Sequence, residues 1–263
     1  MCQRECVFFG FNPKLKKCRT HKKSLTSGTS EEAGWRYYSD NDFSSMPKDC
    51  KDLQENGQTI TGVYDIYPYR TLTIPISVYC DMTTMGDGWT AIQKRVDGSV
   101  TFDRTWTDYK NGFGSPEQNV WIGNDVIHKL TKEKTSSLYV TITLQNGTTL
   151  YEMYDRFSVS NEAGKYKLFL AGPARGTLGD AMLDTGNSAG DLSGMYFSTL
   201  DRDNDRRSNC NCAVVYGGGW WYNGCTYASL NDQWSPESWT IPWYPTVTIW
   251  ISVRGTTMMI RRN

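Results

Sequence analysis

The sequence contains no long apolar run and no excess of charge of either sign. A membrane-spanning helix needs about 20 consecutive apolar residues, and no stretch of the 263 residues approaches that length. Lysine plus arginine and aspartate plus glutamate each total 28, so the formal net charge is zero. Binding to nucleic acid or to an anionic membrane usually relies on clustered positive charge. We therefore expect neither a membrane span nor a nucleic-acid partner.

Histidine is scarce, and the usual catalytic signatures are missing. Only His21 and His128 are present; the first lies in a basic stretch and the second on a predicted helix over residues 124–133. The sequence has no Gly-x-Ser-x-Gly segment, no His-Glu-x-x-His segment and no phosphate-binding loop. Acidic residues such as Glu117 and Asp125 show no pattern that places them in one site. We expect a protein that is not an enzyme.

The N-terminus lacks the features of a signal peptide, yet cysteine is abundant. Residues 1–18 contain neither the apolar segment nor the small-residue cleavage site of a leader. Eight cysteines occupy positions 2, 6, 18, 50, 80, 210, 212 and 225. That number indicates an oxidising compartment, and the sequon at Asn146 fits a secreted glycoprotein. We expect an extracellular protein whose first residues are missing from this sequence or whose start is misassigned.

Aromatic residues and glycine are what the chain has in excess. Aromatic residues make up 13% of the sequence, with 10 tryptophans and 16 tyrosines beside 24 glycines. This composition is typical of loops that present flat amphipathic rings to a ligand, and it is equally typical of core packing.

The local pattern predicts mostly strands with one clear helix. Residues 71–82 and 136–160 have strand character, and the second segment contains Asn-Gly at 146–147, a strong hairpin signal. Residues 124–133 are predicted as a helix with Asn124 or Asp125 as its N-cap. The last hundred residues show little periodicity, and such a long loop-rich region usually needs disulfides or a metal to hold it.

Three alternating aspartates lie in one loop of that region. Carboxylates at Asp201, Asp203 and Asp205 have the spacing found in calcium-binding loops, because hard cations take several oxygen ligands. An EF-hand is excluded, since Arg206 and Cys212 stand where that loop requires glycine and glutamate. The pattern alone fits either a calcium loop or a solvated acidic turn.

Cys210 and Cys212 form a Cys-x-Cys pair that Cys225 follows. A zinc site would need a second such pair or a histidine-rich partner, and the sequence has neither. A redox role would need a lowered thiol pKa, which the sequence does not specify. We expect disulfide bonding here, with Cys210 either bridging to another chain or competing as a partner for Cys225.

Eight segments, in this order, resemble a fibrinogen-related domain, the module at the C-terminal ends of fibrinogen chains, ficolins, tachylectins and angiopoietins. They are DCKDL, GVYDIYP, VYCDM, GDGWTAIQKRVDGSVTFDRTWTDYKNGFG, VWIGNDVIHKLT, STLDRDND, NCAVVYGGGWWYNGC and MMIRR. The resemblance covers residues 48–262. It implies an α+β domain over residues 46–263, with a central antiparallel sheet, few short helices and a loop-rich C-terminal subdomain that binds calcium and ligand.

The segment before this domain carries a weaker resemblance. Residues 1–38 are similar to the end of an apple (PAN) module, truncated before its first strand and followed by a linker in residues 24–34. A cysteine-bearing stalk that cross-links chains is the alternative interpretation.

The resemblance also implies two disulfides and one unusual peptide bond. The disulfides are Cys50–Cys80 and Cys212–Cys225. Many members have a cis peptide bond before the second cysteine of the C-terminal bridge, and the corresponding bond here is Gly224–Cys225.

The calcium site implied by the resemblance consists of two carboxylates and two backbone carbonyls. The side chains are those of Asp203 and Asp205, and the carbonyls lie near Arg207 and Asn209. The segment from Asp205 to Cys212 is one residue longer than usual, so the carboxylates transfer to this sequence better than the carbonyls do.

The ligand pocket implied by the resemblance is apolar, walled by aromatic rings and selective for acetyl groups. Tyr216 matches an aromatic wall, and Cys225 supplies a backbone N–H donor. Thr226 stands where lectin members often have histidine. Trp239 is expected at the place of a second wall tyrosine, and Ile249 replaces a third. Trp220 and Trp221 are expected to pack in the core.

Two functions follow from the resemblance. The first is a secreted, multimeric, calcium-dependent lectin of innate immunity that binds N-acetylated or otherwise acetylated glycans on microbial or cell surfaces. The alternative is a matrix or receptor-binding ligand, of fibrinogen or angiopoietin-like type, that uses the same loops for a protein receptor.

Overall fold

The computed structural model describes residues 46–69, 75–183, 190–234, 241–247 and 252–263 in full, together with the backbone of three N-terminal strands. Those strands are β1 (Phe8–Asn12), β2 (Lys17–His21) and β3 (Arg36–Tyr38). They form a separate antiparallel sheet in the order β2-β1-β3. The linker predicted over 24–34 lies outside the described residues.

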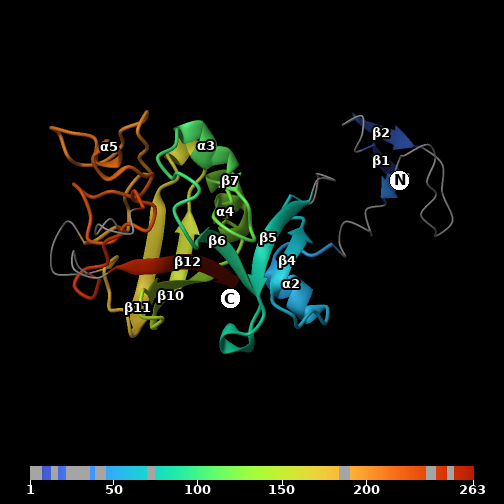
Figure 1. Cartoon of the computed structure of the whole chain (residues 1–263). Helices are drawn as coiled ribbons and strands as arrows, with labels where there is room; N and C mark the ends of the chain where they lie inside the picture. Colours follow the sequence, from blue (N-terminus) through green and yellow to red (C-terminus); the bar gives the residue numbers. More distant parts are fainter. Residues whose placement is uncertain are drawn as a thin grey trace.

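The main body is a nine-stranded sheet whose strand pairs are all antiparallel. Seven strands follow one path in the order β11-β10-β9-β12-β6-β5-β4, and β7 and β8 pair beside β6 (Figure 1). Their bounds are β4 Gly62–Ile66, β5 Ile76–Asp81, β6 Trp89–Arg95, β7 Phe113–Gly114, β8 Val120–Trp121, β9 Ser136–Leu144, β10 Thr149–Val159, β11 Leu168–Gly176 and β12 Val253–Arg262. The last strand of the chain therefore occupies the middle of the sheet, between β9 and β6. This architecture confirms the predicted α+β class.

The hairpin predicted at Asn-Gly 146–147 is confirmed. Gly147 has φ +86° at the turn between β9 and β10, and Asn146 Oδ1 accepts the N–H of Thr148 at 2.9 Å. In β9, the side chains of Leu138, Val140 and Ile142 are buried while those between them are partly exposed. The period-two alternation thus turns one face of the sheet to the core.

In the part of the chain that the structure describes, four short α-helices and two 3-10 turns connect the strands. The helices are α2 Cys50–Glu55, α3 Trp106–Asn111, α4 Asn124–Thr131 and α5 Cys212–Tyr216, and the turns are η1 Thr84–Gly86 and η2 Glu162–Gly164. Thr105 and Asp108 form a capping box at the start of α3. This reciprocal arrangement satisfies two otherwise unpaired N–H groups.

The helix α4 is present, but its predicted N-cap is wrong. Gly123 occupies the cap position with φ +103°, and no side chain caps the helix. A Cβ at this glycine would lie 2.9 Å from backbone atoms of Asn111 and Lys110. Asn124 instead accepts from the Trp121 indole at 3.0 Å. Close packing against α3 excludes a side-chain cap at this position.

Most of the large rings form the core. Trp220 and Trp221 are fully buried, as expected, and the indole of Trp221 donates to the carbonyl of Tyr166 at 2.7 Å. The rings of Phe197 and Trp221 pack edge to face at 5.1 Å. The aromatic excess is therefore largely a packing feature.

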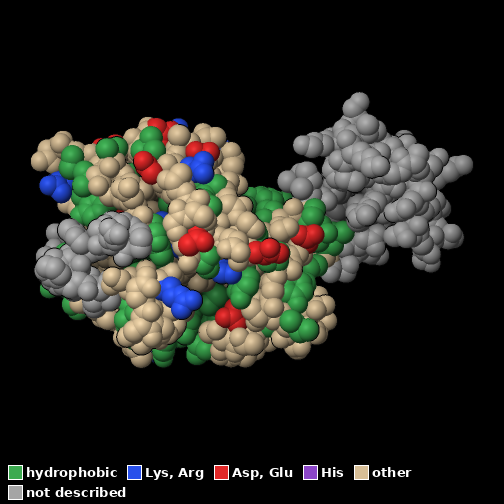
Figure 2. Space-filling view, in the orientation of Figure 1, with side chains coloured by type: hydrophobic (Ala, Val, Ile, Leu, Met, Phe, Trp, Pro, Cys, Tyr) green, Lys and Arg blue, Asp and Glu red, His purple; other side chains and the backbone are tan. Residues whose placement is uncertain are grey.

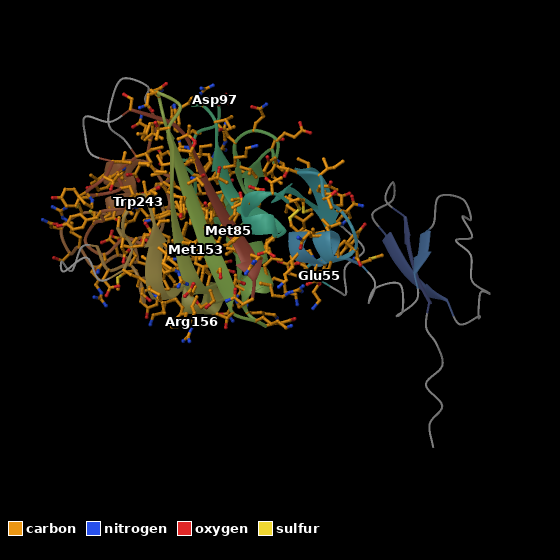
Figure 3. All side chains as sticks on the ribbon, turned by 90° about the horizontal axis from the view of Figure 1, so that it is seen from below. Glu55, Met85, Asp97, Met153, Arg156 and Trp243 are labelled. Carbon is orange, nitrogen blue, oxygen red and sulfur yellow. A yellow bond between two sulfur atoms is a disulfide. The ribbon has the colours of Figure 1, made fainter. Side chains whose placement is uncertain are left out.

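The face of the molecule drawn in Figure 2 shows no dominant charge. Acidic and basic side chains are interspersed over the face drawn in Figure 2. Within the described residues, no helix is both long and apolar enough to cross a bilayer. Figure 3 shows the sheet from below, with Glu55 of α2 at one end and Trp243 among the C-terminal segments at the other. The loops that precede and follow α5 lie at this second end of the sheet (Figure 1).

Candidate functional site

The loop that carries the three aspartates is anchored to the core by two of its own side chains. Asp201 accepts the N–H of Trp106 and the hydroxyl of Thr199, each at 2.8 Å. Asn204 donates from its amide to the carbonyl of Phe197 at 2.9 Å. Asp201 therefore ties the loop to the start of α3 through its Oδ1.

Asp203 and Asp205 lie on consecutive turns of this loop. Asp203 is exposed, and its Oδ1 accepts the N–H of Asp205 at 3.1 Å. Asp205 accepts the N–H of Arg207 on Oδ1 at 2.7 Å and that of Cys212 on Oδ2 at 2.8 Å. Burial, with the nearby charge of Asp203, raises the pKa of Asp205 above its ordinary value. A bound cation would offset this cost, because it favours the ionised carboxylate.

The donor set around these carboxylates fits calcium better than a softer metal. No group of three or more His, Cys, Asp or Glu side chains is gathered for metal binding in the described part of the chain. The backbone carbonyls of Arg207 and Asn209 accept no hydrogen bond from a described residue. Carboxylate and carbonyl oxygens are the donor type that calcium prefers.

The C-terminal disulfide connects this loop to the segment that ends at Thr226. Cys212 and Cys225 are bonded, and so are Cys50 and Cys80 near α2. The Gly224–Cys225 peptide bond is cis, and Gly224 has φ +64°. The backbone N–H of Cys225, a residue that is 5% exposed, has no acceptor among the described residues.

Tyr216 supplies an aromatic surface at the other end of α5. Cys212 begins this five-residue helix and Tyr216 ends it, so the two are separated by about 6 Å along the helix axis. The half-buried ring of Tyr216 stacks on that of Tyr222 at 5.9 Å. Burial raises the pKa of the Tyr216 hydroxyl, so the group is neutral at physiological pH.

The three glycines that follow Tyr216 have distinct roles. Gly217 ends α5 in the left-handed conformation, with φ +70°. A Cβ at Gly218 would lie 2.1 Å from the carbonyl oxygen of Asn231, and one at Gly219 would lie 2.6 Å from the Tyr109 ring. The backbone thus approaches its neighbours at distances that only glycine permits.

Thr226 is turned toward its own backbone. Its hydroxyl donates to the carbonyl of Ala228 at 2.6 Å and accepts the N–H of the same residue at 3.1 Å. Its side chain therefore closes a turn next to Cys225. The other two expected wall positions, Trp239 and Ile249, lie outside the described residues.

A buried charged cluster behind Tyr222 was not foreseen from the sequence. Asp232 is fully buried, and its Oδ1 accepts the hydroxyls of Tyr222, at 3.2 Å, and Ser229. Burial raises the pKa of Asp232 well above its ordinary range. Arg95 donates to the carbonyls of Leu230 and Asp232 at 3.2 and 2.6 Å, and burial lowers its pKa to about 10. Contacts between β6 and residues 229–232, which no local pattern reveals, hold this wall of the site.

Four further features lie in or outside this region. Val214 and Val215 on α5 are each 60% exposed, so the helix presents an apolar face to solvent beside the loop. Cys210 is a free, partly exposed thiol in this structure. Asn146 is exposed at the tip of the β9–β10 hairpin, where a glycan would meet no obstruction from its own turn. His128 contacts the carbonyl of Val159 at 2.8 Å and has a structural role.

The family model for the C-terminal globular domain of fibrinogen beta and gamma chains matches residues 46–263. The chain belongs to this family. Because the match begins at residue 46, it gives no support to the apple-like interpretation of residues 1–38.

The relatives of this fibrinogen-like chain include fibroleukin, a ryncolin and an angiopoietin. It is 44% identical to human fibroleukin over 186 residues, which are 71% of this chain and 42% of that protein. It is 43% identical to ryncolin-4 of Cerberus rynchops, over 70% of this chain and 50% of the relative. It is 39% identical to bovine angiopoietin-2, over 81% of this chain and 42% of that protein. The chain thus spans half or less of the length of these relatives.

Solved structures show the same domain. The fibrinogen-like globe domain of human ANGPTL6 matches with a TM-score of 0.74 and 33% identity, over 82% of this chain and 96% of that one. The lamprey fibrin D-dimer, complexed with the peptide Gly-His-Arg-Pro-amide, matches with a TM-score of 0.73 and 34% identity, over 81% and 73%.

Proposed function

We propose that this fibrinogen-like chain is a secreted, calcium-dependent recognition protein that binds acetylated glycans at the surface formed by Asp203–Thr226. The observation that carries the proposal is the N–H of Cys225, which has no acceptor among the described residues and lies beside the disulfide that leads to Tyr216. A carbonyl oxygen needs such a donor, and a methyl group needs an apolar surface near it. An acetyl group has both requirements.

In this proposal the pocket residues divide the recognition between them. The N–H of Cys225 donates to the acetyl oxygen, and the ring of Tyr216 contacts the acetyl methyl group. Tyr222 fixes the ring of Tyr216 by stacking, and its own hydroxyl donates to the carbonyl of Gly218 at 2.8 Å. Because these groups are already positioned, little conformational entropy is lost on binding.

Calcium has a supporting role in this scheme. Asp203 and Asp205 would hold it by their side chains, with the carbonyls of Arg207 and Asn209, and the ion would supply positive charge and rigidity to the loop. Asp205 also accepts the N–H of Cys212, so ordering its carboxylate orders the residue that forms the pocket disulfide. Calcium binding should therefore strengthen ligand binding without contacting the ligand.

Assembly into oligomers would raise the overall affinity for a surface when each single site binds weakly. Several sites on one assembly that engage one microbial or cell surface gain avidity by about 100- to 10,000-fold. The free thiol of Cys210 provides one point at which chains would be linked. Such a multimer would act as a pattern-recognition lectin in innate immunity.

The exposed apolar face of α5 favours a second candidate function. Val214 and Val215 flank the same loop, and exposed apolar side chains of this kind are typical of protein-binding surfaces. The lamprey relative was solved with a peptide ligand, and angiopoietins are among the relatives. In this alternative the loops bind a protein receptor, and the acetyl pocket is unused.

Calorimetric titration with matched sugars tests the first candidate. N-acetylglucosamine should release heat in calcium and none in chelator, and glucosamine, which lacks the acetyl group, should release none in either. Equal binding of both sugars would exclude an acetyl pocket. No binding of either sugar by protein that binds calcium would favour the receptor-binding alternative.

A further inference from the structure

The side chain of Arg207 lies over the pocket disulfide. Its Nη1 is 3.6 Å from the sulfur of Cys225, and its Nε donates to Asn209 Oδ1 at 3.1 Å. Its backbone N–H is held by Asp205 Oδ1 at 2.7 Å, and it lies 3.9 Å from where a Cβ on Gly224 would be. The contact of Nη1 with Cys225 places the guanidinium beside the proposed acetyl-binding residue.

Most donors of this guanidinium are open. Arginine carries five N–H groups in a planar fork, and the contacts above occupy only two of them. Arg207 forms no ion pair with any carboxylate in the described segments, and the residue is exposed. A planar fork with free donors is the group that binds carboxylate and sulfate bidentately.

Bound calcium would strengthen the electrostatic attraction between the Arg207 guanidinium and an anion. Without the ion, the two negative charges of Asp203 and Asp205 offset the two positive charges of Arg206 and Arg207. A bound Ca²⁺ neutralises the two carboxylates, which leaves the two arginines uncompensated. The field at the exposed guanidinium of Arg207 is then positive.

We propose that Arg207 is a specificity-determining residue that selects acetylated ligands carrying a second, anionic group, either a carboxylate or a sulfate. This inference rests on the proposed acetyl-binding function. The acetyl group occupies the pocket at Cys225 and Tyr216, and the anionic group of the same ligand accepts from the free N–H groups of Arg207.

Titrations of the whole chain in calcium test this assignment with three probes. N-acetylglucosamine is the neutral reference, N-acetylneuraminic acid carries a carboxylate, and N-acetylglucosamine 6-sulfate carries a sulfate. The wild-type protein should bind at least one anionic probe about tenfold more tightly than the neutral one. Which of the two is preferred identifies the anionic group.

Two variants separate the contact from the general charge of the loop. Arg207→Gln should reduce the ratio of anionic to neutral affinity to near one. Arg206→Gln removes the same charge from the neighbouring residue, for which the structure shows no contact with Cys225, and should leave most of the ratio intact. Arg207→Lys, which keeps the charge but lacks the fork, should give an intermediate ratio. Thermal unfolding of each variant shows whether the fold is kept.

The outcomes distinguish this inference from the function on which it rests. Equal affinities for all three probes in the wild type would overturn the role of Arg207 and leave the acetyl pocket standing. Equal effects of Arg206→Gln and Arg207→Gln would also overturn it, because the selectivity would then come from net charge. If no probe binds while calcium does, the proposed acetyl-binding function itself fails.

Discussion

Asp205 Oδ2 accepts the backbone N–H of Cys212 at 2.8 Å, and this hydrogen bond joins the candidate calcium loop to the disulfide of the candidate pocket. Few direct polar contacts link the two features, and this one lies at the first residue of α5. It gives a physical reason why cation binding in one loop would affect ligand binding at the next.

Asp203 and Asp205 should differ sharply from Asp201 in their effect on calcium binding. We expect Asp203→Asn to weaken calcium binding by about tenfold or more, because affinity depends on the number of charged ligands. Asp201→Asn is the matched control, since its carboxylate is directed to Trp106 and Thr199. Titration with calcium, monitored by calorimetry, measures both. Similar losses in the two variants would contradict the assignment of ligands.

The ring of Tyr216, rather than its hydroxyl, should be required for acetyl binding. No described residue shares a hydrogen bond with that hydroxyl, so Tyr216→Phe should bind as the wild type does. Tyr216→Ala removes the apolar wall and should weaken binding by about 10- to 200-fold. Tyr196→Ala, which removes a 40%-exposed ring elsewhere, is the control. Wild-type affinity in Tyr216→Ala would place the pocket elsewhere.

Both disulfides should contribute to the stability of the fold, but only Cys212–Cys225 should be required for ligand binding. Removing either by Cys→Ser pairs should cost about 2–4 kcal/mol of unfolding free energy. The Cys50–Cys80 bridge spans 30 residues and the Cys212–Cys225 bridge 13, so loss of the longer loop should cost roughly 0.7 kcal/mol more on entropic grounds. Only loss of Cys212–Cys225 should abolish ligand binding under conditions where the protein is folded. Denaturant unfolding and calorimetry give the two quantities, and retained binding without the second bridge would refute the pocket.

Asp232 should make the stability of the protein depend on pH in a defined direction. In the unfolded chain this carboxyl ionises near 3.8, whereas in the folded protein burial keeps the proton to a higher pH. At pH values above the pKa of the unfolded chain, Asp232 is therefore protonated more often in the folded state than in the unfolded state. As a result, the contribution of this group to the unfolding free energy falls as pH rises.

Asp232→Asn removes that dependence. Relative to the wild type, the variant should become progressively more stable from about pH 5 to about pH 8. Urea unfolding at several pH values measures the difference. A difference that does not change with pH would show that Asp232 has the same ionisation in both states.

The local features of the fold could be predicted from the sequence, and the long-range ones could not. The turn at Asn146-Gly147 depends on the conformation of two adjacent residues, and it was predicted correctly. The cap of α4 depends on the backbone of Asn111, which no neighbour of Gly123 in the sequence reveals. The bond between Trp106 and Asp201 joins residues 95 positions apart. Only a folded structure shows that the first aspartate of the loop is hydrogen-bonded to the start of α3.

For the candidate site, too, some residues could be predicted from the sequence and others could not. The resemblance supplied the residues Asp203, Asp205, Tyr216 and Cys225, because they lie in segments with distinctive spacing. It did not supply the burial of Asp232 or the position of the Arg207 side chain, because both follow from packing between separate loops.

The coupling between calcium and the acetyl pocket is the central claim, and thermodynamic reciprocity gives it one direct measurement. The dissociation constant for calcium is measured calorimetrically with and without saturating N-acetylglucosamine. If the two sites are linked through Asp205 and Cys212, the sugar should tighten calcium binding by the same factor by which calcium tightens sugar binding. A calcium affinity that is identical in the presence and absence of bound sugar would contradict the account.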